Sequence, residues 1–362
     1  MPDLLIELLS EEIPARMQRK ACSDLNKLFT NGITEMGLTY KSSATFSTPR
    51  RLTLVLENVS SKSISRVEEK RGPRTDAPAV AIQGFLKNVG LELTQLEVRK
   101  EKKGEFYFAS LRTEGRKADD IISVVLEEIV RNFPWPKSMR WGQNRLKWVR
   151  PLHSIICILY DEGGSNVVDV NIEGISSGDK TVGHRFMGTG EFSVTSFEDY
   201  TSKLKKEFVI LDPSDRAEII LQEVKNQAFA QGLELINDPG LLDEVVGLIE
   251  WPVVLIGKIE DRFLALPPVV LQTSMKEHQK FFSIQNPKNN KVVKFATVAN
   301  RETSDQGLTI ISGNQKVLSA RLADAKFFWD NDLRIINSSG FGTWSEKLKN
   351  VTFHNKLGSQ FE

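Results

Sequence analysis

Cations alternate with tryptophans along residues 137–150, KSMRWGQNRLKWVR. The charged and aromatic members are Lys137, Arg140, Trp141, Arg145, Lys147, Trp148 and Arg150. Lysine and arginine neutralise phosphates, and indole rings stack on bases or on the cations themselves, so this composition is typical of an RNA-contacting surface. The alternative is that the tryptophans anchor a core and the cations are solvated. The sequence favours neither interpretation over the other.

Two further segments concentrate polar side chains that could hold an anion. His184 and Arg185 lie in GHRF, on an expected loop, where the arginine fork could bind a phosphate or carboxylate. A structural arginine that bonds backbone carbonyls is the favoured interpretation there. Lys276 and Lys280 lie in SMKEHQK, ahead of two phenylalanines. This segment could hold a phosphate or a tRNA end, although a charged helix end is more common.

Several catalytic and cofactor motifs are missing from the sequence. It contains no G-x-x-x-x-G-K-[ST] phosphate loop, and Gly183, Gly188 and Gly190 lack the spacing of a dinucleotide fingerprint. The four histidines are far apart and none lies in an H-E-x-x-H pattern. A G-x-S-x-G elbow is also missing. The sequence therefore predicts no catalytic residue and no metal site.

Composition restricts the classes of protein. The chain has 362 residues, and 48 Lys and Arg nearly balance 47 Asp and Glu, so a generic DNA-coating protein is disfavoured and any nucleic-acid contact must be a local patch. The longest apolar runs are far shorter than the roughly 20 residues that cross a bilayer. Two cysteines cannot form a disulfide framework, which makes a reducing, cytoplasmic compartment the default expectation.

Hydrophobic periodicity predicts a mixture of strands and helices. We expect strands at residues 1–9, 51–59, 105–112, 145–160, 167–175, 251–259 and 291–299. We expect helices at residues 14–36, 79–89, 118–133, 197–204, 213–232, 241–249, 267–275 and 313–329. Residues 61–79 are charged and contain proline, which predicts a loop or linker whose Arg66, Lys70, Arg71 and Arg74 could meet phosphate.

The elements do not alternate regularly as in a doubly wound sheet. The predicted class is therefore α+β, with mixed sheets and packed helices in more than one domain. The length, at roughly 150 residues per domain, corresponds to two or three domains.

Taken together, ten short strings resemble the β subunit of bacterial glycyl-tRNA synthetase. Their order along the chain also matches that family, and the set spans nearly the whole sequence. The strings lie at residues 11–14, 48–52, 71–73, 139–142, 149–151, 183–186, 250–255, 274–280, 313–314 and 321–328. Two places depart from the family pattern, Leu8-Leu9-Ser10 and residues 337–344.

This resemblance implies the non-catalytic subunit of a heterotetrameric ligase, with two α and two β subunits, that attaches glycine to its tRNA at the expense of ATP. The α subunit carries the class II active site in this family, so ATP and Mg²⁺ are expected there and no cofactor on this chain. The implied regions are an N-terminal α+β region at residues 1–145, a B3/B4-like α+β region at 146–335 and the truncated start of a helical HD-type region at 336–362. Without the family's C-terminal half, this chain alone is expected to be inactive.

The resemblance also implies that the β subunit binds tRNA. Its most favoured contact residues here are Arg140, Trp141, Lys147 and Arg150. Weaker candidates are Arg50, Arg51, His184, Arg185, Lys276 and Lys280. The expected partners are the α subunit and glycine tRNA, with no membrane and no DNA. The alternative is a pure scaffold for the α subunit, in which the missing C-terminal half recognises tRNA.

Overall fold

The computed structural model describes residues 1–101, 104–113, 115–143, 145–354 and 358–359. It confirms the predicted mixture of sheets and packed helices. The chain forms two compact units. Unit 1 consists of residues 1–13, 17–183 and 189–206, and unit 2 consists of residues 14–16, 184–188 and 207–362. None of the described helices has the length and apolar character needed to cross a membrane.

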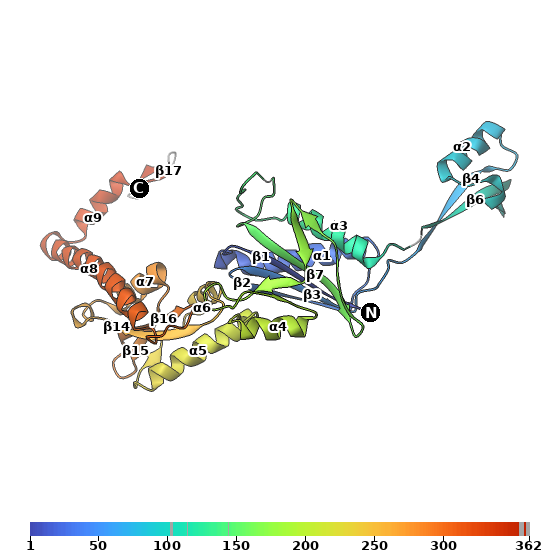
Figure 1. Cartoon of the computed structure of the whole chain (residues 1–362). Helices are drawn as coiled ribbons and strands as arrows, with labels where there is room; N and C mark the ends of the chain where they lie inside the picture. The colour runs from blue at the N-terminus through green and yellow to red at the C-terminus, as the bar shows by residue number, and fades with distance from the viewer. Residues whose placement is uncertain (102–103, 114, 144, 355–357, 360–362) are drawn as a thin grey trace. The chain divides into compact units, whose positions relative to one another are not determined.

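The main sheet of unit 1 has β1 near its centre (Figure 1). β1 pairs antiparallel with β3 on one side and with β7 on the other. The strand order is β2-β3-β1-β7-β10-β9, with β8 beside β7. The strands are β1 (Asp3–Ser10), β2 (Ser42–Thr48), β3 (Arg51–Glu57), β7 (Leu152–Asp161), β8 (Gly164–Val167), β9 (Asn171–Ile172) and β10 (Ile175–Gly178). Because β7 shares this sheet, unit 1 continues well beyond residue 145.

Helices cover both faces of this sheet. Leu4, Ile6 and Leu8 of β1 share one core with apolar residues of α1 (Ala15–Glu35) and α3 (Ala118–Arg131). The alternate residues of β1 point the other way, as strand geometry requires, and Glu7 there meets Tyr200 of α4 (Phe197–Lys206). A two-stranded sheet of β11 (Lys180–Val182) and β12 (Glu191–Ser193) precedes α4.

A second, smaller sheet in unit 1, which we call the small sheet, has the order β4-β6-β5. Its elements are β4 (Arg66–Arg74), α2 (Ala79–Val89), η1 (Leu93–Gln95), β5 (Glu97–Glu101) and β6 (Gly104–Thr113). The expectation of a loop at residues 61–79 is therefore wrong for β4. Its sequence is almost entirely polar, yet it pairs along its length with β6, where aromatic residues face its arginines.

Unit 2 is a four-stranded sheet with helices packed on it. The order is β13-β15-β16-β14, with antiparallel pairs throughout. The strands are β13 (Glu234–Leu235), β14 (Val253–Lys258), β15 (Phe282–Asn286) and β16 (Lys291–Ala299). The longer helices are α5 (Pro213–Phe229), α6 (Pro239–Val246), α7 (Pro268–Gln279) and α8 (Leu308–Ser339). Short elements complete it, namely η2 (Asp261–Phe263), α9 (Gly342–Lys347), η3 (Leu348–Asn350), β17 (Thr352–His354) and β18 (Gly358–Ser359).

Local sequence explains where two of these helices begin. Asp212 precedes Pro213 and accepts a hydrogen bond from the Ser214 amide at 2.7 Å. Asp238 precedes Pro239 and accepts one from the Leu241 amide at 3.0 Å. An aspartate cap followed by proline in the first turn satisfies an otherwise open amide and fixes the helical φ angle.

Candidate nucleic-acid interface

The tRNA-contact residues most favoured by the sequence lie together on one loop between α3 and β7. We call residues 137–150 the basic loop. Its two sides are joined by backbone hydrogen bonds, because the Met139 amide donates to the Trp148 carbonyl at 2.8 Å and the Trp148 amide donates to the Met139 carbonyl at 3.3 Å. The loop is thus a closed structure with a fixed base.

Aromatic packing anchors this loop in the core of unit 1. The rings of Phe133, Trp135 and Trp148 lie 4.7 to 5.0 Å apart, and Trp148 has no exposed surface. Trp141 is half-buried and packs against the same core. Edge and tilted aromatic contacts add to the stabilisation that burial of these rings provides. The tryptophans therefore anchor the loop, as one of the two interpretations of the sequence predicted.

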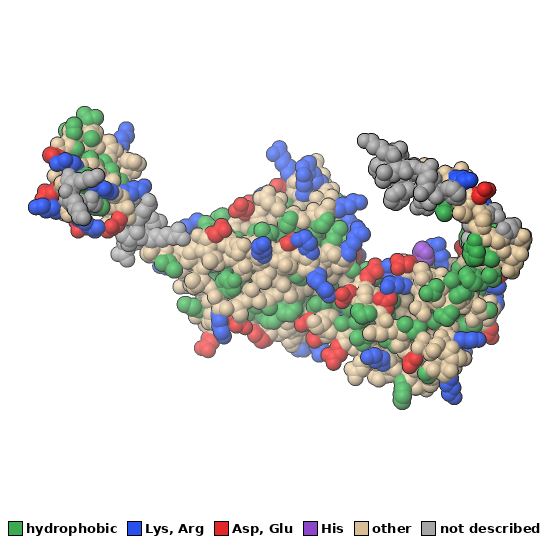
Figure 2. Space-filling model, turned by 180° about the vertical axis from the view of Figure 1, so that it is seen from behind, with side chains coloured by type: hydrophobic (Ala, Val, Ile, Leu, Met, Phe, Trp, Pro, Cys, Tyr) green, Lys and Arg blue, Asp and Glu red, His purple; other side chains and the backbone are tan. Residues whose placement is uncertain are grey.

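The cations of the basic loop are all exposed: Lys137, Arg140, Arg145, Lys147 and Arg150. Figure 2 shows Lys and Arg side chains gathered on unit 1. Within the described part of the chain, the side chains of Lys137, Arg140 and Lys147 make no hydrogen bond or ion pair. Arg150 donates to the neighbouring Val149 carbonyl at 3.3 Å and to no other described residue. Lys137, Arg140, Lys147 and Arg150 therefore present positive charge that pairs with no carboxylate among the described residues.

One carboxylate, that of Glu173, binds the backbone of the basic loop and also forms an ion pair with a neighbouring arginine. Glu173 accepts from the Arg145 amide at 3.3 Å and pairs with the Arg131 guanidinium at 2.8 Å. Hydrogen bonds from Arg131, and then from the Arg145 amide, lower the pKa of Glu173. Glu173 thus stays ionised and fixes the start of the loop at Arg145.

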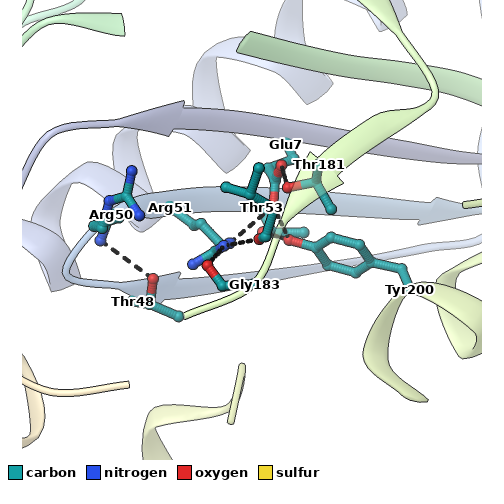
Figure 3. Close-up of polar contacts among 9 residues, drawn as sticks. Glu7, Thr48, Arg50, Arg51, Thr53, Thr181, Gly183 and Tyr200 are labelled. Carbon is teal, nitrogen blue, oxygen red and sulfur yellow. Dashed lines mark hydrogen bonds and ion pairs between the residues drawn. The ribbon is translucent and has the colours of Figure 1, made fainter. Parts of the chain in front are cut away.

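Arg51, one of the weaker candidates, lies inside unit 1 (Figure 3). Its Nε donates to Oε2 of Glu7 at 3.1 Å, and its Nη2 donates to the carbonyls of Val182 and Gly183. The side chain has no exposed surface, so the expectation that Arg51 contacts RNA is contradicted by its burial. Leaving one member of such a buried pair alone costs about 3 to 5 kcal/mol, which makes Arg51 a structural residue.

The same buried network includes two hydroxyl groups. Glu7 accepts hydrogen bonds from Thr181 and from Tyr200, both at 2.5 Å, and Thr53 lies 3.1 Å from the Tyr200 hydroxyl (Figure 3). Burial, and then the charge of Glu7, raise the pKa of Tyr200 well above its usual value.

Arg50, another weaker candidate, lies next to Arg51 in the sequence but is half-buried, and its amide donates to Oγ1 of Thr48 at 3.2 Å.

His184 and Arg185 differ in exposure although they are neighbours. His184 is 2% exposed, its amide donates to the Glu207 carbonyl at 2.8 Å, and its Nδ1 accepts from the Phe186 amide at 3.2 Å. These contacts make His184 a loop-stabilising residue, and its burial contradicts a direct RNA contact. Arg185 is exposed, as is Phe186, whose ring centroid lies 5.5 Å from the Arg301 guanidinium.

Lys276 and Lys280 both link α7 to α6. Lys276 pairs with Asp238 at 2.7 Å, and Lys280 pairs with Glu244 at 3.0 Å. The hydrogen bond that the Lys276 ammonium donates to Asp238 raises the pKa of Lys276. Lys276 and Asp238 also line a surface pocket of about 300 Å³. Both lysines are thus partnered, as the charged-helix-end interpretation predicted.

The four favoured candidates therefore lie on the basic loop together with the exposed side chains of Lys137 and Arg145, which belong to the same segment of the sequence. Arg50 and Arg51 lie at the β2–β3 turn of unit 1, while His184, Arg185, Lys276 and Lys280 belong to unit 2. Among the described residues, no group of three or more His, Cys, Asp or Glu side chains could hold a metal ion.

Comparisons with known proteins agree over the length of the chain. The family model described as "Glycyl-tRNA synthetase beta subunit" matches residues 4–362. Relatives named "Glycine--tRNA ligase beta subunit" include those of Ruegeria sp. (strain TM1040), 61% identical over 99% of this chain, and Phenylobacterium zucineum, 47% identical over all of it. The alignments cover 52% and 53% of those relatives, so the chain spans about half the length of the curated relatives it matches. The chain belongs to the glycyl-tRNA synthetase beta subunit family.

Proposed function

We propose that this chain is the tRNA-binding part of a glycine–tRNA ligase β subunit and that the basic loop contacts the tRNA backbone. In the assembled enzyme, two α and two β subunits attach glycine to its tRNA for protein synthesis in the cytoplasm, and ATP and Mg²⁺ act at the α subunit. This chain supplies binding and no catalytic group, so it does not charge tRNA alone. The single observation that carries the proposal is the cluster of exposed cations on an anchored loop, among which Lys137, Arg140 and Lys147 pair with no described carboxylate.

Physical chemistry explains how such a loop would bind RNA. Each cation that meets a phosphate releases a condensed counterion, which gives affinity that falls as salt rises. Arg140 offers a planar fork that can hold two phosphate oxygens, and Lys147 offers a point charge. The buried Trp148 and the Met139–Trp148 backbone pair fix the loop before RNA arrives. Less conformational entropy is then lost on binding.

The remaining candidates differ in how they would contact tRNA. Arg50, Arg185, Lys276 and Lys280 stay as weaker proposed tRNA contacts, and Lys276 and Lys280 would have to leave their carboxylate partners on α6. Trp141 would stack through the exposed part of its ring.

We also propose that residues 146–335 form a B3/B4-like region and that an HD-type region starts at residues 336–362.

One observation favours the scaffold alternative, in which this half of the subunit contacts only the α subunit. Phe327 and Phe328 on α8 are 68% and 62% exposed, and their rings lie 5.6 Å apart. Large exposed aromatic side chains are common in protein interfaces. A measurement of whether this chain binds tRNA distinguishes the two functions.

The test compares two double variants that carry the same net charge. Arg140→Gln with Lys147→Gln removes two cations from the basic loop, and Lys205→Gln with Lys206→Gln removes two exposed cations from the end of α4. Both change the formal net charge from +1 to −1. The measurement is the affinity for glycine tRNA across a salt series.

We expect the basic-loop variant to bind more weakly and its log-log salt slope to fall by about 1.4 to 1.8, because each phosphate contact contributes roughly 0.7 to 0.9. The α4 variant should keep a slope close to that of the unmodified chain. Equal losses in the two variants would show that overall charge, not the loop, governs binding. No binding by the unmodified chain at low salt would support the scaffold alternative.

A further inference from the structure

The small sheet has one covered face and one open face. Helix α2 lies against β4 on the covered side (Figure 1). Ala109 of β6 is fully buried there, and a Cβ on Gly72 would lie 2.5 Å from the ring of Phe85 in α2. Because side chains alternate along a strand, the neighbours of Ala109 and Gly72 point to the opposite face.

Two phenylalanines and two arginines occupy that opposite face. Phe106 and Phe108 are half-buried and alternate with Tyr107 on β6. The guanidinium carbon of Arg71, on β4, lies 3.9 Å from the centroid of the Phe106 ring. That of Arg99, on β5, lies 5.0 Å from the centroid of Phe108. Each ring of this open face is thus stacked with a guanidinium from a flanking strand.

Carboxylates hold the Arg99 guanidinium in place. Nη1 and Nη2 of Arg99 donate to the two oxygens of Glu69 at 3.0 and 2.8 Å, and Nη2 also donates to Glu97 at 2.7 Å. These side chains remain between 39% and 58% exposed. The Arg99 guanidinium, held over the Phe108 ring by two hydrogen bonds to Glu69, is thus a flat surface that is fixed in place before a ligand binds.

We propose that this open face is a second RNA-binding site, which binds a single-stranded segment by stacking its bases on the Arg71–Phe106 and Arg99–Phe108 pairs. Unpaired bases stack on aromatic rings and on guanidinium planes, and strands of an open sheet are a frequent platform for them. Arg74, the last residue of β4, lies beside Gly104 and pairs with Asp76 at 2.9 Å, and it would meet phosphate by exchanging this partner. Glu69 and Glu97 can accept hydrogen bonds from base amino groups.

The charge of the open face favours RNA over a protein partner. The centre of a protein–protein interface is depleted of acidic side chains and of lysine, because they would have to be desolvated, whereas arginine and aromatic residues are enriched there. Here two of the six side chains of the open face, Glu69 and Glu97, are acidic and remain 48% and 58% exposed. A stacked base covers the ring and guanidinium planes while leaving the charged edges in contact with water.

The test uses a fluorescent single-stranded RNA octamer of mixed sequence and measures its affinity by anisotropy. Arg71→Gln removes one stacking guanidinium, and Phe106→Leu removes one ring while keeping an apolar side chain. The matched control is Lys100→Gln, which removes the same charge from the other face, one residue after Arg99 on β5. The basic-loop variant Arg140→Gln with Lys147→Gln separates this site from the one proposed above.

We expect Arg71→Gln and Phe106→Leu each to weaken octamer binding about fivefold or more, since a base stacked on protein contributes roughly 1 to 3 kcal/mol. Lys100→Gln and the basic-loop variant should leave octamer affinity within twofold. Failure of the octamer to bind would overturn the proposal, as would equal losses in Arg71→Gln and Lys100→Gln. Neither result would bear on tRNA binding by the basic loop, which is measured separately with glycine tRNA.

Discussion

At the scale of single residues, burial separates side chains that the sequence treats alike. Arg51 and Arg140 are both arginines in strings that match the family, yet Arg51 has no exposed surface and Arg140 is exposed. The partner of Arg51 is Glu7, 44 residues away in the chain. The Arg51–Glu7 pair cannot be predicted from composition or spacing, because the two residues meet only when strands β1 and β3 pair in the sheet. The clustering of cations and tryptophans at residues 137–150 was visible in the sequence because these residues are neighbours along the chain, although a strand was expected from residue 145.

The buried network predicts how stability depends on alkaline pH. Burial and the charge of Glu7 raise the pKa of Tyr200 above its usual value of 10.0. Above about pH 10 the unfolded chain releases this proton and the folded chain keeps it, so the contribution of Tyr200 to stability is lost as pH rises. Tyr160 acts in the same direction, since burial raises its pKa to about 12.

Tyr200→Phe should therefore flatten the alkaline loss of stability. Between pH 10 and 11 the free energy of unfolding should fall by about 1 kcal/mol less than in the unmodified chain, because the unfolded tyrosine loses most of its proton over this range, and the difference in slope should approach about 1.4 kcal/mol per pH unit, or one proton, above pH 11. Urea unfolding at several pH values measures this slope. Thr53→Val removes a neighbour of the Tyr200 hydroxyl but no titrating group, so it should keep the original slope. An unchanged slope in Tyr200→Phe would contradict the prediction.

At the scale of elements, hydrophobic periodicity and capping residues located most helices and strands. The predicted strand at 291–299 coincides with β16, and the helix at 79–89 coincides with α2. β4 was missed because RVEEKRGPR has no apolar alternation, and its pairing with β6 depends on contacts such as Arg71 with Phe106. The strand expected from residue 145 begins only at Leu152, because the Trp148 anchor holds the preceding residues in a loop.

The start of α6 offers a test of capping in unit 2. Asp238 accepts from the Leu241 amide at 3.0 Å and pairs with Lys276 at 2.7 Å. Asp238→Ala removes both contacts and should lower the free energy of unfolding by about 1 to 2 kcal/mol. Asp238→Asn keeps a capping oxygen and loses only the charge, so it should cost less than about 1 kcal/mol. Urea unfolding at pH 7 compares the two, and equal losses would show that the cap contributes nothing.

The same variants should differ in acid. Burial raises the pKa of Asp238, but the hydrogen bonds from Lys276 and from the Leu241 amide outweigh it, and the net pKa is lowered from 3.8. The contribution of the charged form is therefore present above about pH 4 and is lost as pH falls further. Asp238→Asn should be closest in stability to the unmodified chain at low pH, where the ion pair no longer exists.

At the scale of the whole molecule, positive and negative charges nearly balance, so nucleic-acid binding must depend on a local patch of cations. The formal net charge is only +1, while the basic loop alone carries five exposed cations. The sequence could indicate this loop but not the grouping of strands into sheets, because pairing partners such as β1 and β7 are about 150 residues apart. For the same reason the open face of the small sheet, which joins Arg71, Arg99 and Phe106 from three strands, was not visible in the sequence.

If the basic loop binds tRNA as proposed, it should contribute affinity and not discrimination. Its exposed cations are suited to phosphates, and phosphate contacts position a nucleic acid without reading its sequence. Arg140→Gln with Lys147→Gln should then weaken binding of glycine tRNA and of a non-cognate tRNA by the same factor, leaving their affinity ratio unchanged. Competition binding at one fixed salt concentration measures that ratio. A ratio that falls toward one would show instead that Arg140 or Lys147 reads a base, since a lost bidentate base contact relaxes specificity by about 1 to 3 kcal/mol.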